Sequence, residues 1–257
     1  MYIRLGLCLW AGWISGHSWL SHHHTRGDGK TYKLISFNVL ESNPRGDSVV
    51  QLIQDIDPDF VLINEYANEW TDHLRSIHDD YPYRVLQPRP HAFGIALFSK
   101  YPLSAVEVVQ LAAEHTDAPM IVAQVEIGRA TIRLAAVHLL SPRNPRMMAI
   151  RNQEIRQVSA RLAPNGRPTI LIGDFNCVPW SPFLKDLLVS TRLSDSRQGF
   201  GWQATWPANQ WALRIPIDNA YVSQQVEVID RQLLDANGSD HLPLLLEFSV
   251  GYDHHRD

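Results

Sequence analysis

Cysteine is scarce in this chain, which has 2 cysteines, Cys8 and Cys177, among 257 residues. Because Cys8 falls in an apolar N-terminal stretch, a folded domain that begins after this stretch contains one thiol and no internal disulfide. The motifs Gly-x-Ser-x-Gly and Gly-x-x-x-x-Gly-Lys are also missing from the sequence. A serine hydrolase and a P-loop nucleoside triphosphatase are therefore disfavoured.

Positive charge is not in excess either. The chain has 23 lysine and arginine residues against 27 aspartate and glutamate residues, for a formal net charge of −4. This balance argues against a high-affinity, non-specific DNA binder. It is still compatible with chemistry on a phosphate, because a local basic cleft or bound metal ions can supply positive charge where it is needed.

The N-terminus carries an uncharged run, Leu5–Leu20, that follows Arg4 and is short for a membrane span of about 20 residues. It suits the apolar region of a signal peptide, with residues 15–18 as an imperfect cleavage region. A truncated anchor or an interfacial helix fits the run nearly as well. We therefore expect an exported or membrane-associated protein in which residues 1–30 form this segment and a linker.

The rest of the chain is long and apolar enough for one large domain, since 45% of all residues are hydrophobic and 19% are charged. We place this domain at residues 31–250, followed by a tail at 251–257, and we expect a monomer. Strand-like and helix-like patterns alternate within it, which predicts an α/β sandwich. The expected strands lie at 33–39, 59–65, 93–99, 103–111, 120–127, 131–138, 168–172, 217–222, 226–229 and 244–248, and the expected helices at 49–56, 145–162 and 183–189.

Polar side chains stand where several of the expected strands end. Gly173-Asp174-Phe175-Asn176 directly follows an apolar run, and side chains two apart on a strand point to the same face. We therefore expect Asp174 and Asn176 to face one cleft, where a carboxylate can hold a hard cation and an amide can donate to a phosphate oxygen. Taken alone, the tetrad is also compatible with an ordinary turn after a strand.

Four further segments repeat this pattern of a strand with a polar end. They are Leu34–Val39 with Asn38, Asp59–Glu65 with Glu65, Ile217–Val222 with Asp218, and Ser239-Asp240-His241 before an apolar strand. In this order along the chain, the five segments resemble the endonuclease/exonuclease/phosphatase superfamily, whose best-known members are deoxyribonuclease I-like enzymes. The resemblance runs from about Tyr32 to Phe248. It departs from the usual pattern at Asn64, Asn219 and Cys177, and the last two leave open what faces the substrate.

The resemblance implies a deoxyribonuclease I-like fold, a four-layer α/β sandwich of two packed, mostly antiparallel (mixed) sheets flanked by helices. It also implies a divalent-metal-dependent phosphoesterase, most simply a phosphodiesterase or nuclease. Mg²⁺, which prefers oxygen ligands, is the implied cofactor, and Mn²⁺ would substitute. The implied metal ligands are Asn38, Glu65, Asp174 and Asp240.

The same resemblance implies the roles of the catalytic residues. Asp174 would orient or deprotonate the attacking water, and Asn176 and Asn38 would hold the phosphate in line. His241 would contact the phosphate while Asp218 accepts its other ring proton. His138 would donate to a phosphate oxygen or protonate the leaving group, and we favour the donor role.

Aromatic residues precede the expected strand at 217–222, in a loop where members of the superfamily often contact substrate. Trp202 is a candidate for stacking on a base, a sugar or a lipid headgroup, and Arg214 is a candidate phosphate contact. Both residues can equally be explained by packing. Two alternatives to a nuclease remain open at this point: a phosphomonoesterase or phospholipid (sphingomyelin-type) phosphodiesterase at a membrane, and a non-catalytic, membrane-tethered binding module.

Overall fold

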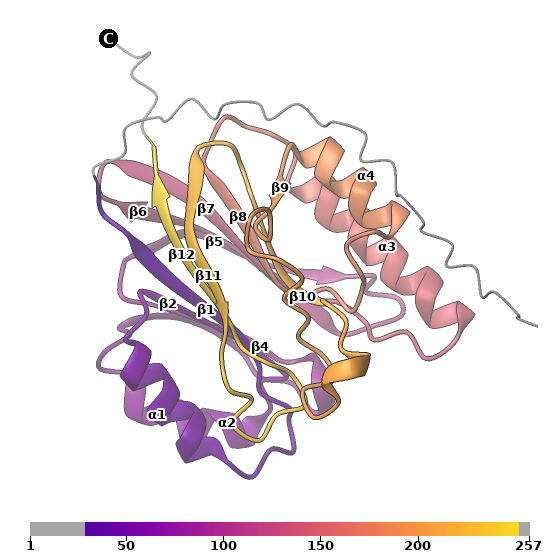
Figure 1. The fold of residues 1–257 in the computed structure, drawn as a ribbon, viewed down its shortest axis with the longest axis horizontal. Coiled ribbons are helices and arrows are strands. Elements are labelled where there is room, and N and C mark those ends of the chain that lie inside the picture. The colour runs from indigo at the N-terminus through magenta and orange to yellow at the C-terminus, as the bar shows by residue number, and fades with distance from the viewer. Residues whose placement is uncertain (1–28, 252–257) are drawn as a thin grey trace, which may run out of the picture.

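The computed structural model describes residues 29–251 of the chain (Figure 1). The expected N-terminal export or anchor segment and almost all of the expected tail lie outside the described residues. Between residues 29 and 251, none of the helices is both long and apolar enough to cross a membrane.

Two six-stranded sheets form the centre of the fold. The first has the order β11-β12-β1-β2-β4-β3 and the second the order β5-β6-β7-β8-β10-β9. The strands of the first sheet are β1 (Tyr32–Asn38), β2 (Phe60–Asn64), β3 (Tyr83–Gln87), β4 (Ile95–Ser99), β11 (Val226–Leu233) and β12 (Leu244–Val250). Those of the second are β5 (Leu103–Leu111), β6 (Ala118–Ile127), β7 (Ala130–His138), β8 (Thr169–Asp174), β9 (Ser194–Asp195) and β10 (Asp218–Val222).

Both sheets are mixed and mostly antiparallel. The pairs β1–β2 and β7–β8 are parallel, and the other strand pairs are antiparallel. Helices cover the outer face of each sheet (Figure 1). The first sheet carries α1 (Gly46–Ile56), α2 (Asn68–His73) and the 3₁₀ turn η1 (Leu74–Ile77), and the second carries α3 (Pro145–Arg161) and α4 (Pro182–Thr191). Short 3₁₀ turns, η2 (His91–Phe93) and η3 (Trp211–Leu213), lie in loops. The expected deoxyribonuclease I-like sandwich is therefore confirmed.

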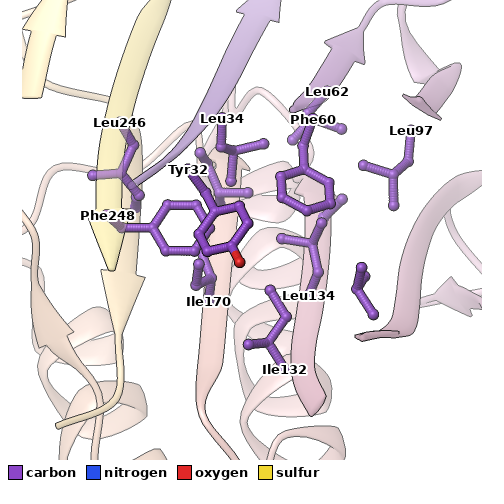
Figure 2. Close-up of a cluster of buried hydrophobic side chains, with 14 of the residues drawn as sticks. Tyr32, Leu34, Phe60, Leu62, Leu97, Ile132, Leu134, Ile170, Leu246 and Phe248 are labelled. Atoms are coloured by element: carbon purple, nitrogen blue, oxygen red, sulfur yellow. The ribbon is translucent and has the colours of Figure 1, made fainter. Parts of the chain in front are cut away.

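Strand periodicity divides the buried side chains into an inner and two outer layers. Along β8, Ile170 and Ile172 belong to the cluster between the sheets, whereas Leu171 packs with α3 and α4. Figure 2 shows the inner cluster, with Leu34 and Tyr32 of β1 facing Leu134 and Ile170 of the second sheet. Burying a side chain of this size contributes about 1.5–3 kcal/mol, so the inner layer holds the two sheets together.

The helix ends agree with the local chemistry of the sequence. Asn144 caps α3 by accepting a hydrogen bond from the backbone N–H of Met147 at 2.9 Å, and Pro145 occupies the first turn. At the end of α1, Asp57 adopts a left-handed conformation with φ of 48°. On α3, Met148 is exposed whereas Arg151 is buried, so the buried face of this helix begins at Arg151.

Some elements were not expected from the sequence, namely α2, η1, η2, η3, β3 and β9. The edge strand β3 is half-exposed along its whole length, and β9 has two residues, so neither carries a buried apolar pattern. The turn Gly128-Arg129 does connect β6 and β7, as expected.

Gly173, the residue before Asp174, lies where β7 and β8 come very close together. Its φ is 144°, and a Cβ atom built on it would lie 1.9 Å from the carbonyl oxygen of Val137. This carbonyl also accepts a hydrogen bond from the side-chain amide of Asn64, at 3.0 Å, across the two sheets. Only glycine fits this position.

Candidate active site

The candidate site lies where the inner layer between the sheets changes from apolar to polar. Asp174 follows Ile170 and Ile172 on the inner face of β8, two residues further along. The same step of two leads from inner-face residues to Asn38 on β1 and to His138 on β7. At the start of β10, Asp218 stands two residues before the inner-face Ala220 and directly opposite Asp174. Four strands therefore bring polar side chains to one end of the sandwich.

His241 and Asp218 form a buried ion pair in this cleft. His241 Nδ1 lies 2.8 Å from Asp218 Oδ2, and both residues are almost fully buried. Burial by itself lowers the pKa of His241, but the charge and hydrogen bond of Asp218 outweigh it and raise the pKa to about 10. The imidazole is therefore protonated at neutral pH, and its Nε2 points toward Asp174 at 3.9 Å.

His138 approaches the same carboxylate from β7. Its Nε2 lies 3.6 Å from Asp174 Oδ2, while its Nδ1 is buried without a hydrogen-bond partner among the described residues. Burial, together with the charge of His241, lowers the pKa of His138 to about 4. His138 is therefore neutral at pH 7.

Asp174 stands at the centre of these contacts. Its Oδ1 accepts from the backbone N–H of Asn176 at 2.8 Å, and its Oδ2 accepts from the side-chain amides of Asn38 and Asn176 at 3.1 and 3.3 Å. Burial and the charge of Asp218 raise the pKa of Asp174, while His241 and these hydrogen bonds oppose the rise. A carboxyl group with a raised pKa is suited to accept a proton near neutral pH.

Asn176 lies in the cleft because the chain turns after β8, and not because Asn176 belongs to the strand. β8 ends at Asp174, and Asn176 adopts a left-handed conformation with φ of 45°. Its amide then donates to the carbonyl oxygen of Leu139 at 2.8 Å as well as to Asp174. Asn176 therefore lies beside Asp174, as expected, but the expected reason, alternation along a strand, is wrong because the strand ends at Asp174.

Asn38 and Glu65 form the wall on the side of the first sheet. The Asn38 amide nitrogen lies 3.1 Å from Glu65 Oε1, and its oxygen accepts from the backbone N–H of Leu40 at 3.1 Å. This orientation presents a donor to the cleft and turns the potential ligand oxygen of Asn38 to the backbone. Glu65 accepts from the backbone N–H of Glu41 through its other oxygen, at 2.9 Å. Burial raises the pKa of Glu65, although the hydrogen bonds from Glu41 and Asn38 oppose this.

Asp240 lies on the loop between β11 and β12, next to His241. Its Oδ2 accepts from the indole N–H of Trp206 at 3.0 Å, and its Oδ1 is buried with no hydrogen-bond partner among the described residues. The charge of Asp240 raises the pKa of Glu65, so the two carboxylates are within electrostatic range of each other. The Ser239 hydroxyl fixes this loop, since it donates to the Asn38 carbonyl at 2.7 Å and accepts from the His241 N–H at 3.0 Å.

The donors in the cleft fit a hard divalent cation. Asp240 Oδ1, an orphaned buried carboxylate oxygen, and the carboxylates of Glu65 and Asp174 are the oxygen ligands that Mg²⁺ prefers. Asp174, Asp218 and His241 also place one potential ligand atom each within 4.8 Å of one another. Because Asp218 and His241 are bonded to each other, we regard them as a pair that faces a substrate anion.

Trp202 and Arg214 lie on the loop before β10. Trp202 is 59% exposed and stacks on Trp180, with ring centroids 5.5 Å apart and an interplanar angle of 20°. Trp180 belongs to the loop that also carries Asn176. The Arg214 guanidinium donates to the backbone carbonyls of Pro207 and Ala208, so it holds its own loop together.

Two of the three departures from the superfamily pattern, Asn219 and Cys177, face away from the cleft. Asn219 points to the outer face of β10, where its amide contacts Asp195 at 3.3 Å and its oxygen accepts from Arg231 at 3.0 Å. Cys177 is buried in the outer layer beneath α3 and α4. Asn64 bridges the sheets through the Val137 carbonyl. Asn64 thus lies on the inner face of β2, in register with Asn38 on β1.

Two contributions to the site were missed by the sequence argument. Trp206, which was not among the expected site residues, donates to Asp240. Arg151, which interrupts the apolar stripe of α3, donates to the backbone carbonyl of Asn176 and so supports the Asp174–Asn176 turn. The sequence signal that could have pointed to Arg151 was an arginine on the apolar face of an amphipathic helix. For Trp206, the available signal was its place in the Thr205-Trp206-Pro207 sequence.

A cavity of about 420 Å³ opens beside Glu65. It is lined by Glu41, Ser42, Ala67, Asn68, Glu69 and Pro90. Its charged lining residues are acidic, so it is unfavourable for a phosphate chain.

Comparison with known proteins agrees with this geometry. Residues 35–241 match the model of the Endonuclease/Exonuclease/phosphatase family. Among solved structures, TDP2 from D. rerio in complex with a single-strand DNA product is 17% identical, with a TM-score of 0.73 over 85% of this chain and 99% of that chain. The human Nocturnin catalytic domain with a bound sulfate anion is 19% identical, with a TM-score of 0.72 over 86% and 94%. Beta toxin from Staphylococcus aureus is 19% identical, with a TM-score of 0.61 over 84% and 99%.

The family match over residues 35–241 defines the class of protein to which this chain belongs. The chain belongs to the Endonuclease/Exonuclease/phosphatase family, whose members are generally hydrolytic phosphoesterases that use divalent metals. The structural neighbours, all under 25% identical, show the shared fold. No curated protein matches the chain in sequence.

Proposed function

We propose that this protein is a divalent-metal-dependent phosphodiesterase that hydrolyses P–O bonds of nucleic acid or of a small phosphodiester. The observation that carries the proposal is the arrangement of Asp174 with the His241–Asp218 pair. A buried carboxylate with a raised pKa and a protonated imidazole lie 3.9 Å apart in one cleft. Hydrolysis of a phosphoester needs both an acceptor for the proton of water and positive charge at the phosphoryl oxygens.

In this proposal, Asp174 orients the attacking water and accepts its proton. The amides of Asn176 and Asn38 donate to Asp174 and hold its carboxylate in place. Each NH2 group already makes two hydrogen bonds, so each amide would hold the phosphate in line by exchanging one of these bonds for a bond to a phosphoryl oxygen. His241 donates a hydrogen bond from Nε2 to a phosphoryl oxygen, and Asp218 keeps the ring protonated and oriented. His138, which is neutral, donates a hydrogen bond to the phosphate and does not protonate the leaving group.

Glu65 and Asp240 would hold the divalent cation, with Asp174 beside them. When bound, Mg²⁺ or Mn²⁺ supplies charge stabilisation at the phosphoryl oxygens. Asn38 serves this site as a donor that fixes the carboxylates of Glu65 and Asp174, because its amide nitrogen faces both.

The substrate group next to the phosphate is proposed to lie against Trp202. Its stack with Trp180 leaves indole surface exposed on the rim of the cleft, and base–aromatic stacking is worth about 1–3 kcal/mol per base. This aromatic rim supports a phosphodiester that carries a base over a simple phosphomonoester. Arg214 lies on the same loop and is our candidate for a second phosphate contact.

A phospholipid headgroup is the second candidate substrate. Trp211 and Leu213 of η3 are 82% and 66% exposed, and exposed apolar side chains of this size mark interaction surfaces. An apolar tip beside a phosphoesterase cleft supports a substrate that is presented at a lipid surface.

The test is a panel of phosphoesters assayed with Mg²⁺, with Mn²⁺ and with chelator. The panel contains single- and double-stranded DNA, RNA, nucleotides, inositol phosphates and sphingomyelin vesicles. We expect metal-dependent hydrolysis of phosphodiesters that Asp174→Asn reduces by about 10³-fold, as expected for loss of a general base. His241→Ala should also inactivate the enzyme.

The matched controls are Asp186→Asn and His115→Ala, because both residues are exposed. These variants should retain the wild-type rate. A folded protein that hydrolyses no phosphoester with either metal would contradict the proposal and favour a non-catalytic binding module. Hydrolysis of sphingomyelin but not of nucleic acid would select the second candidate.

A further inference from the structure

The segment Thr205–Ala208 is attached to the loop of Asp240 by backbone hydrogen bonds. The N–H of Ala208 donates to the carbonyl of Asp240 at 2.7 Å, and the N–H of Leu242 donates to the carbonyl of Thr205 at 3.0 Å. Trp206 therefore lies beside Asp240 with its backbone fixed from that direction.

The segment is also attached to the chain that leads into β10. Trp206 and Ile215 form an antiparallel bridge, and the Thr205 hydroxyl accepts from the N–H of Asp218 at 3.2 Å. The ring of Trp206 lies 6.4 Å from that of His241. Trp206 is thus held between the two segments that carry the His241–Asp218 pair.

The indole N–H of Trp206 donates a hydrogen bond to one carboxylate oxygen of Asp240, and the other carboxylate oxygen can still bind a different partner. Nε1 donates to Oδ2 at 3.0 Å, and Oδ1 is buried without a partner among the described residues. A buried carboxylate oxygen without a hydrogen bond is costly, so such an oxygen is maintained where a ligand completes it. An indole is a neutral donor with no acceptor, so it orients the carboxylate without neutralising its charge.

We propose that Trp206 is a positioning residue, which holds Asp240 by Oδ2 so that Oδ1 is presented to a divalent cation shared with Glu65. This inference rests on the proposed function, because it takes a divalent cation as the ligand of the cleft. Partners that orient metal ligands in this way typically change metal affinity or activity by about 10–100-fold when they are removed.

The experiment measures Mn²⁺ binding to the metal-free, full-length protein by electron paramagnetic resonance of free Mn²⁺. Trp206→Phe keeps an aromatic ring beside His241 and removes the N–H. We expect its dissociation constant for Mn²⁺ to rise by about tenfold or more. Trp211→Phe is the matched control, because Trp211 is exposed on the same loop, and it should bind Mn²⁺ like the wild type.

A double-mutant cycle tests whether the effect passes through Asp240. Asp240→Ala should weaken Mn²⁺ binding, and adding Trp206→Phe to it should weaken binding no further. A further loss in the double variant would overturn the inference, because Trp206 would then act on the fold in general. Thermal unfolding without metal shows whether each variant is folded.

If Trp206→Phe does not fold, the benzothiophene analogue of tryptophan at position 206 keeps the shape of the indole and removes its N–H. Its Mn²⁺ affinity should fall as predicted for Trp206→Phe. Wild-type affinity in a folded variant without the N–H overturns the inference and leaves the proposed function standing. A wild-type protein that binds no Mn²⁺ would overturn the proposed metal site and this inference together.

Discussion

His241, on the loop before β12, and His138, at the end of β7, meet the same carboxylate from two sides. Their Nε2 atoms lie 3.9 and 3.6 Å from Asp174 Oδ2, and both rings are almost fully buried. Yet the pKa of His241 is raised to about 10, whereas that of His138 is lowered to about 4.

The two histidines differ in pKa because their Nδ1 atoms, which point away from Asp174, have different partners. His241 Nδ1 bonds to Asp218 at 2.8 Å, and His138 Nδ1 has no partner among the described residues. Burial disfavours the charged form of both rings, and an adjacent carboxylate reverses this for one of them. One cleft thus holds a cationic and a neutral imidazole, and the function that we propose gives them different roles toward a phosphate.

Among the changes that test the contrast between the two histidines, the largest effect is expected for Asp218→Asn, which removes the charge behind His241. The pKa of His241 should fall below 10, because Asp218 is the main contribution that opposes burial and only the charges of Asp174 and Asp240 would then oppose it. We expect kcat/KM at neutral pH to fall by about 10–100-fold, as for other residues that orient a catalytic group. Histidine NMR titration measures the pKa, and steady-state kinetics measure the rate.

Asp186→Asn serves as the control for this variant and should leave the pKa of His241 unchanged. If His241 still titrated near pH 10 in Asp218→Asn, the contrast between the two histidines would have another origin than Asp218. A normal rate with a lowered pKa would show that catalysis does not need the cationic form.

A smaller effect is expected for His138→Gln. Glutamine retains a neutral donor, so the rate should fall by about tenfold or less if His138 only donates a hydrogen bond. The comparison is made with two substrates, one whose leaving group needs protonation and one with a nitrophenolate leaving group. A large loss that is confined to the first substrate would assign His138 as the general acid, against our proposal.

The last prediction concerns the pH dependence of stability, measured without metal. For His241, whose folded pKa is raised, the stabilisation is complete below the unfolded pKa of about 6.5 and is lost as the pH rises toward about 10. For His138, whose folded pKa is lowered, stability is lost as the pH falls from about 6.5 toward about 4. Urea unfolding at a series of pH values measures both limbs.

The loss of stability at alkaline pH (the alkaline limb) and the loss at acid pH (the acid limb) are each tested with one variant. His241→Gln should flatten the alkaline limb and His138→Gln the acid limb, and exposed His115→Gln should change neither. If both variants altered the same limb, the two rings would carry the same charge in the folded protein, and the contrast drawn here would fail.

The sequence predicted most of the strands from the alternation of side chains, and it predicted the cleft residues from polar side chains at strand ends together with the resemblance to the superfamily. Ile170, Ile172 and Asp174 lie on one face of β8, so an inner-face acid at the strand end can be read directly from the residues. The same parity places Asn219 on the outer face. That Asn219 avoids the cleft could therefore have been predicted.

The contacts made by turns and loops could not be predicted in this way. Asn176 reaches Asp174 through a left-handed residue, and the side-chain orientation of Asn38 depends on the backbone N–H of Leu40. Trp206 and Asp240 are far apart in the chain and meet through hydrogen bonds between loops. Such contacts depend on tertiary structure and have no periodic signal in the sequence.

In the Gly-Asp-Phe-Asn tetrad, Gly173 is the residue that allows β7 and β8 to approach each other closely. Any larger residue there would strike the Val137 carbonyl and compete with Asn64 for it, and the next residues along β7 and β8 are His138 and Asp174. The glycine contributes no chemical group, yet it sets the spacing between the imidazole and the acid. In the tetrad, Gly173 thus determines how closely β7 and β8 approach each other, and Asp174 is the residue for which we propose a role in the reaction.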